Sequence, residues 1–132
     1  MKTTLAIIVI LAAVTQAIEI KYSAKSIDKY VAGGKECAKE EGVDPIYLTK
    51  LNDKNQLPNY NEIGCLSLCM MKKFNLMDSE LHFISEEFLQ FFDNPVVKET
   101  LSSSMDKCTL MYDTMKSCQI AYDLHKCILV NL

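Results

Sequence analysis

The chain has 132 residues, of which 49% are hydrophobic and 23% are charged. This length suits a single domain, and the apolar fraction excludes an intrinsically disordered chain. A formal charge of −3 and the absence of arginine argue against a nucleic-acid-binding protein, which needs a basic surface. Six cysteines in so short a chain make the redox compartment the next question.

The N-terminus has the layout of a secretory signal peptide. Lys2 precedes an apolar run from Leu5 to Val14, and small residues up to Ala17 suit cleavage. The run is shorter than the roughly 20 apolar residues that a membrane span needs, so no membrane insertion is expected. We therefore expect residues 1–17 to be removed and residues 18–132 to form one domain. A secreted chain matures under oxidising conditions, so its cysteines should be paired.

Helical periodicity runs through nearly the whole mature chain, and no segment alternates with period two for long enough to predict a strand. The first predicted helix covers residues 21–41, with a weak point at Gly33-Gly34, since glycine is a poor helix former. A short helix follows over residues 45–52, with Asp44 as its N-cap.

A turn at residues 57–61 precedes four further predicted helices, whose apolar residues recur at steps of three and four. These helices cover residues 62–74, about 78–92, 95–112 and 113–128. The predicted fold class is therefore all-α, with about six helices.

Helix geometry limits the pairing of the six cysteines, which are spaced C-x27-C-x3-C-x38-C-x9-C-x8-C. Cys65 and Cys69 are four residues apart, so they share a helix face with parallel side chains that are poorly placed to bond each other. Cys118 and Cys127 are nine residues apart and lie on opposite sides of one helix. Both pairs should therefore bond to other segments, and several of the fifteen connectivities of six cysteines stay open.

With these spacings the sequence resembles a known family. The x3 and x8 spacings, flanked by gaps near 27 and 38, are the cysteine signature of the insect odorant-binding proteins, which include the pheromone-binding proteins. Residues 65–78 look like that family's third helix and following turn, and residues 118–127 look like its sixth. The resemblance covers the whole mature chain and implies helices around an apolar cavity. It also implies the disulfides Cys37–Cys69, Cys65–Cys118 and Cys108–Cys127.

The resemblance further implies that the inner faces of the first and the last three helices line a ligand pocket. Methionine is frequent and suits a tolerant apolar site. Position relative to the matching cysteines suggests Tyr30, Met71, Met105, Leu124 and Ile128 as lining residues. We add Leu76, Met77, Phe83, Phe88 and Leu101. Hydroxyls that could orient a ligand are present on Tyr30, Ser67, Thr109 and Tyr122.

The function implied is that of a secreted, extracellular carrier that reversibly binds odorants or pheromones and brings them to chemosensory receptors. The sequence contains no recognisable catalytic motif, so no enzyme activity is expected, and no cofactor, metal or nucleic acid either. We expect a monomer or a weak homodimer. Two alternatives stay open. The chain could carry ligands in haemolymph, seminal fluid, saliva or venom, or it could be an interaction module that acts through its surface.

The segment after Cys127 has only five residues, too few for the long acid-responsive tail of some family members. We hypothesise that residues 128–132 cover the pocket mouth as a small apolar lid. Histidine titrates in the range where release could be controlled, but we expect His82 and His125 to be plain surface residues.

Overall fold

The computed structural model describes residues 21–132, so the expected signal peptide at residues 1–17 lies outside the described residues. The elements are α2 (Ala24–Glu41), the 3-10 helix η1 (Pro45–Lys50), α3 (Tyr60–Ile63), α4 (Leu66–Lys73), α5 (Ser85–Leu89), α6 (Pro95–Met111) and α7 (Cys118–Val130). The described residues contain helices and no strand, which confirms the all-α prediction. None of these helices is long and apolar enough to cross a membrane.

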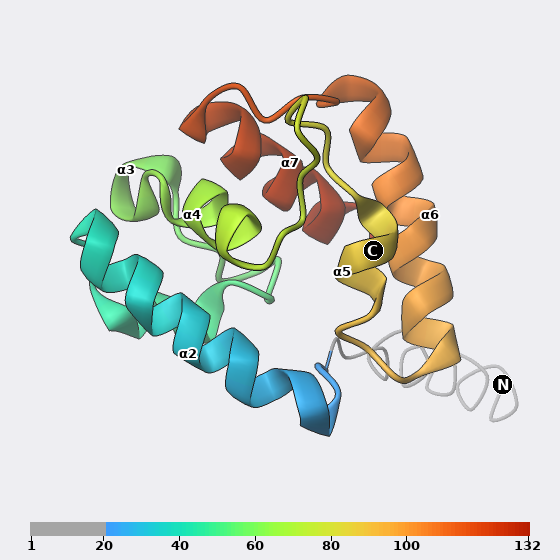
Figure 1. Cartoon of the computed structure of the whole chain (residues 1–132), viewed down its shortest axis with the longest axis horizontal. Helices are drawn as coiled ribbons and strands as arrows, with labels where there is room; N and C mark the ends of the chain where they lie inside the picture. The colour runs from blue at the N-terminus through green and yellow to red at the C-terminus, as the bar shows by residue number, and fades with distance from the viewer. Residues whose placement is uncertain (1–20) are drawn as a thin grey trace, which may run out of the picture.

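The helices pack as a chain of neighbours around α7. Helix α2 packs on α4, α4 packs on α7, and α7 packs on α6, with α5 resting on α6 (Figure 1). The 3-10 helix η1 lies against α2. This order leaves α2 and α6 on opposite sides of the molecule, with their inner faces turned toward a shared core.

Polar side chains at the helix ends explain why several helices begin where they do. Asn94 Oδ1 accepts a hydrogen bond from the backbone N–H of Val96 (2.9 Å) at the start of α6. Ser117 Oγ accepts from the N–H of Ile120 (3.2 Å) and starts α7. Such caps satisfy N–H groups that have no partner inside the helix. At the other end of α2, Gly42 adopts the left-handed conformation that terminates many helices.

Two predicted helices are shorter than expected. The predicted helix over residues 62–74 is divided into α3 and α4 at Gly64, where φ is +49°. The predicted helix over residues 113–128 begins only at Cys118, because the Ser117 cap fixes its first turn.

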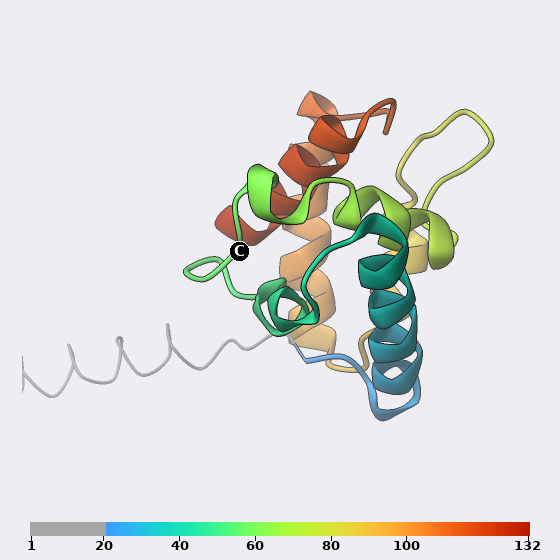
Figure 2. The same cartoon turned by 90° about the vertical axis from the view of Figure 1, so that its left-hand side faces the viewer.

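The largest departure is the segment before α5, which we predicted to be helical from residue 78. Residues 76–84 instead form a loop with isolated bridges between Met77 and Phe83 and between His82 and Thr114, and it projects from the helical body (Figure 2). Asp78 Oδ1 accepts hydrogen bonds from the N–H groups of Glu80 and His82, both 2.9 Å. This side-chain turn competes with the helical hydrogen-bond pattern, which explains the late start of α5.

The glycine pair in α2 does not interrupt the helix. A Cβ atom at Gly33 would lie 2.5 Å from Cε1 of Phe74, far inside van der Waals contact. The missing side chain therefore allows the Phe74 ring to lie directly against α2. At Gly34 a Cβ would lie 3.2 Å from Cδ2 of Leu48, which is a much milder approach.

Three disulfides join the main helices, and they are the pairs that the resemblance implies. Cys37–Cys69 joins α2 to α4, Cys65–Cys118 joins the starts of α4 and α7, and Cys108–Cys127 joins α6 to α7. Each disulfide closes a loop and restricts the unfolded chain, which stabilises a fold by roughly 2–4 kcal/mol. The helices α2, α4, α6 and α7 are thus tied to one another covalently.

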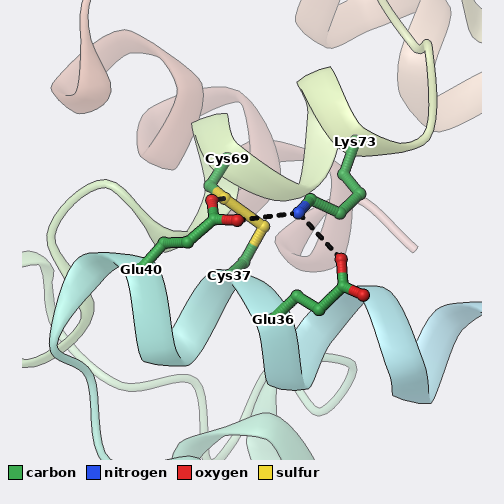
Figure 3. Close-up of a disulfide and its surroundings, with 5 residues drawn as sticks. All are labelled: Glu36, Cys37, Glu40, Cys69 and Lys73. Carbon is green, nitrogen blue, oxygen red and sulfur yellow. Dashed lines mark hydrogen bonds and ion pairs between the residues drawn. A yellow bond between two sulfur atoms is a disulfide. The ribbon is translucent and has the colours of Figure 1, made fainter.

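Charged residues surround the Cys37–Cys69 disulfide at the surface (Figure 3). Lys73 Nζ lies 2.9 Å from Glu36 Oε2 and 3.0 Å from Glu40 Oε1. The hydrogen bonds to Glu36 and Glu40 raise the pKa of Lys73 above its ordinary value. Glu40 also approaches both sulfur atoms, but these are bonded to each other and are not the thiolates that a metal ion would need.

Candidate functional site

A cavity of about 80 Å³ lies among the helices. It is lined by residues of α2, α4, α5, α6 and α7 and of the segments between them, namely Tyr22, Tyr30, Leu51, Ser67, Met70, Met71, Phe74, Leu76, Phe83, Phe88, Phe91, Leu101, His125, Ile128 and Leu129. None of these side chains is an acid, a lysine or an arginine. The site therefore suits a small, uncharged molecule.

Seven of the ten lining residues expected from the sequence face this cavity. They are Tyr30, Met71, Leu76, Phe83, Phe88, Leu101 and Ile128. Met105 and Leu124 are fully buried in the hydrophobic core and do not line the cavity. Met77 is partly buried in the loop before α5 and also lies outside the lining. Helix periodicity identifies a buried face, but it does not distinguish a residue that packs on another helix from one that borders a space.

Sequence reasoning missed several lining residues for identifiable reasons. Tyr22 and Leu51 fell inside the predicted helices over residues 21–41 and 45–52, but in the structure Tyr22 precedes α2 and Leu51 follows η1. Met70 and Phe74 also line the cavity and are not among the ten residues expected from the sequence. Leu129 was expected in a lid and not in the wall.

Aromatic rings form much of the cavity wall. The Tyr22 ring stacks on Tyr30 with centroids 4.1 Å apart, and on Phe92 at 4.9 Å. Phe74 meets Phe91 edge to face at 5.4 Å. Stacked and edge-to-face pairs of this kind add to the stability that burial alone provides. They make this side of the cavity a rigid apolar surface.

One polar group in the wall consists of tyrosine hydroxyls. Tyr22 Oη donates a hydrogen bond to Asn52 Oδ1 at 3.3 Å. Burial raises the pKa of the Tyr22 hydroxyl well above its ordinary value, and burial raises that of Tyr30 as well. Both phenols are therefore neutral. Two other candidate hydroxyls lie elsewhere, because Thr109 donates to the carbonyl of Met105 and Tyr122 donates to that of Pro58.

The second polar group contains His125, and here the expectation of a plain surface histidine is wrong. His125 Nε2 lies 2.7 Å from the carbonyl oxygen of Leu51, and Nδ1 lies 3.0 Å from Ser67 Oγ. Both ring nitrogens are thus engaged inside the protein. Burial lowers the pKa of His125 below its ordinary value, so the ring is neutral at pH 7. His82 does lie at the surface, with its side chain 44% exposed.

The family of the chain agrees with this fold and cavity. The sequence profile of the PBP/GOBP family matches residues 20–131. The chain belongs to the PBP/GOBP family. The resemblance to the insect odorant-binding proteins is thereby confirmed, since their six cysteines form three disulfides as in this chain. No curated protein and no solved structure matches the chain.

In this PBP/GOBP-family chain, the C-terminal segment forms part of the wall. Helix α7 continues through Val130, and Ile128 and Leu129 line the cavity from within that helix. The buried Ser104 hydroxyl donates a 2.6 Å hydrogen bond to the carbonyl of Ile128 and holds the end of α7 against α6. Ile128 and Leu129 are therefore part of the cavity wall, and a lid role for residues 128–132 stays a hypothesis.

Proposed function

We propose that this PBP/GOBP-family chain is a secreted, soluble carrier that reversibly binds small hydrophobic odorants or pheromones and brings them to chemosensory receptors. The observation that carries the proposal is a cavity bounded by apolar and aromatic side chains without a single charged group. Such a lining favours an uncharged apolar ligand and gives no counter-ion for a carboxylate or an ammonium group. The seven expected residues that face the cavity are the proposed ligand contacts.

Removal of apolar ligand surface from water supplies the binding free energy. Each buried Å² contributes about 25 cal/mol, so a compact ligand that buries about 200 Å² gains about 5 kcal/mol before the loss of its own freedom of motion. The carrier role requires no reacting group, and all six cysteines are held in disulfides and offer no free thiol.

Displacement of the hydrophobic fluorescent probe N-phenyl-1-naphthylamine tests the proposal on the oxidised mature chain. Leu101→Phe places a larger side chain at a position that lines the cavity and is 1% exposed. Leu110→Phe is the matched control, since Leu110 lies on the same helix and is 88% exposed. We expect probe affinity to fall at least about tenfold in Leu101→Phe and to stay unchanged in Leu110→Phe.

Two outcomes would contradict the proposal. If the disulfide-intact protein binds no apolar probe, the chain is not a carrier of such ligands. If Leu101→Phe melts as a folded protein and binds the probe like the parent chain, the cavity is not the binding site. Native mass spectrometry of protein purified from its source tissue would then identify any ligand that stays bound, and the tissue itself would separate a chemosensory role from other carrier roles.

A further inference from the structure

Ser67, His125 and Leu51 form a hydrogen-bonded chain in the cavity wall, and its hydrogens point in one direction. A carbonyl oxygen carries no hydrogen, so His125 Nε2 must donate to the Leu51 carbonyl at 2.7 Å. A neutral imidazole carries only one N–H, so Nδ1 has none. Nδ1 must then accept the hydrogen of the Ser67 hydroxyl across 3.0 Å. The backbone of Leu51 thereby determines the orientation of a side chain on α4.

This arrangement turns Ser67 into an acceptor toward the cavity. Its only hydrogen is used by His125, while the residue itself lines the cavity and is 5% exposed. The oxygen lone pair that remains is what Ser67 offers to a ligand. The hydroxyls of Tyr22 and Tyr30 also have partners inside the protein. Tyr22 donates its hydrogen to Asn52, and the Tyr30 hydroxyl interacts with both Tyr22 and Asn52.

We propose that Ser67 is the specificity-determining residue of the cavity and that it selects ligands that donate a hydrogen bond, above all alcohols, over ketones, aldehydes and esters of the same shape. This inference rests on the proposed carrier function and names its ligand class. An alcohol donates its hydroxyl hydrogen to Ser67 Oγ. A carbonyl compound instead brings a second acceptor to a group that has no hydrogen to give. A neutral hydrogen bond of this kind corresponds to a roughly three- to tenfold difference in Kd.

Cyclohexanol and cyclohexanone provide a matched pair of probes, since they share one compact ring skeleton and differ in the ability to donate. Their Kd values are measured by displacement of N-phenyl-1-naphthylamine from the oxidised mature chain. We expect the preference for cyclohexanol in the parent chain to fall by roughly three- to tenfold in Ser67→Ala. Thr109→Val is the control, because it removes a hydroxyl that lies outside the cavity lining, and it should keep the parent preference.

A second variant tests the direction of the hydrogen bonds. His125→Phe removes the acceptor of the Ser67 hydrogen and frees that hydrogen for a ligand. We expect cyclohexanone to bind more tightly to this variant than to the parent chain, which reduces the preference for the alcohol. In Ser67→Ala the preference should fall for a different reason, because cyclohexanol binds more weakly.

The nitrogen chemical shifts of His125 give a readout that needs no variant and no ligand. We expect the pattern of a neutral ring protonated at Nε2. A ring protonated at Nδ1, or at both nitrogens, at neutral pH would overturn the inference. Equal preferences in the parent chain and Ser67→Ala would also overturn it while leaving the carrier function intact. Failure of the fluorescent probe itself to bind would instead overturn the carrier function.

Discussion

Substitution of Gly33 by alanine tests whether the close packing of α2 on Phe74 shapes the cavity. The new Cβ would lie 2.5 Å from Cε1 and 2.7 Å from Cζ of Phe74. An ordinary carbon–carbon contact is about 3.5 Å, so the ring must move by about 1 Å. Because Phe74 lines the cavity, we expect the ring to move into that space and to reduce it.

Two opposing effects determine the stability of the variant. Alanine is favoured over glycine inside a helix by about 1 kcal/mol. Overpacking of a core typically costs about 1–3 kcal/mol. We therefore expect Gly33→Ala to lower the free energy of unfolding by about 0–2 kcal/mol.

Gly34→Ala is the matched control, since it lies in the same helix and gains the same helix propensity. Its Cβ would lie 3.2 Å from Cδ2 of Leu48 and 3.5 Å from Cε of Met70, and both atoms are ends of flexible side chains that can rotate away. In urea unfolding, Gly33→Ala should have a lower free energy of unfolding than Gly34→Ala. In probe displacement, it should bind the probe several-fold more weakly. Equal stability and equal probe affinity of the two variants would refute the argument that Phe74 needs the glycine.

Three further predictions address the rest of the fold. Burial lowers the pKa of His125, so the unfolded chain takes up a proton at this ring more readily than the folded chain does. The free energy of unfolding should therefore decrease as the pH falls below about 6.5, the pKa of histidine in the unfolded chain. Urea midpoints should depend less on pH in His125→Phe, which has no group that titrates at this position. Ser104→Ala should lower the free energy of unfolding by about 1–3 kcal/mol, since it leaves a buried carbonyl of α7 without its donor; an unchanged urea midpoint would contradict this. Replacement of Cys108 and Cys127 by alanine opens a loop with a sequence separation of 19 and should cost about 3 kcal/mol in the same assay, and a loss below about 1 kcal/mol would show that this disulfide adds little.

The cysteine spacing and the helical periodicity together predicted much of this protein. Periodicity of three and four predicted an all-α class, because a helix that faces a core repeats its apolar residues in this way. The cap at Asp44 marks the start of a helix in the sequence and in the structure alike. These features depend on neighbouring residues, so they can be read without knowing the fold.

The loop before α5 shows where local patterns fail. Its apolar residues have helical spacing, yet Asp78 ties the backbone into a turn and His82 pairs with Thr114, which lies 32 residues along the chain. A contact over such a distance does not influence periodicity. Similarly, nothing in the sequence near His125 indicates that its ring bonds to Ser67 and to the carbonyl of Leu51.

The sequence by itself therefore determined the class of protein, the number of cysteines available for pairing and most of the residues that become buried. The tertiary structure alone decided which buried residues border a cavity and which only pack, as Leu101 and Met105 on the same helix illustrate. The physical reason is that burial depends on the periodicity of one helix, whereas a cavity depends on how several helices meet. The direction of the hydrogen bonds at Ser67 belongs to this second kind of information, because it is determined by a carbonyl 16 residues earlier in the sequence and a histidine 58 residues later.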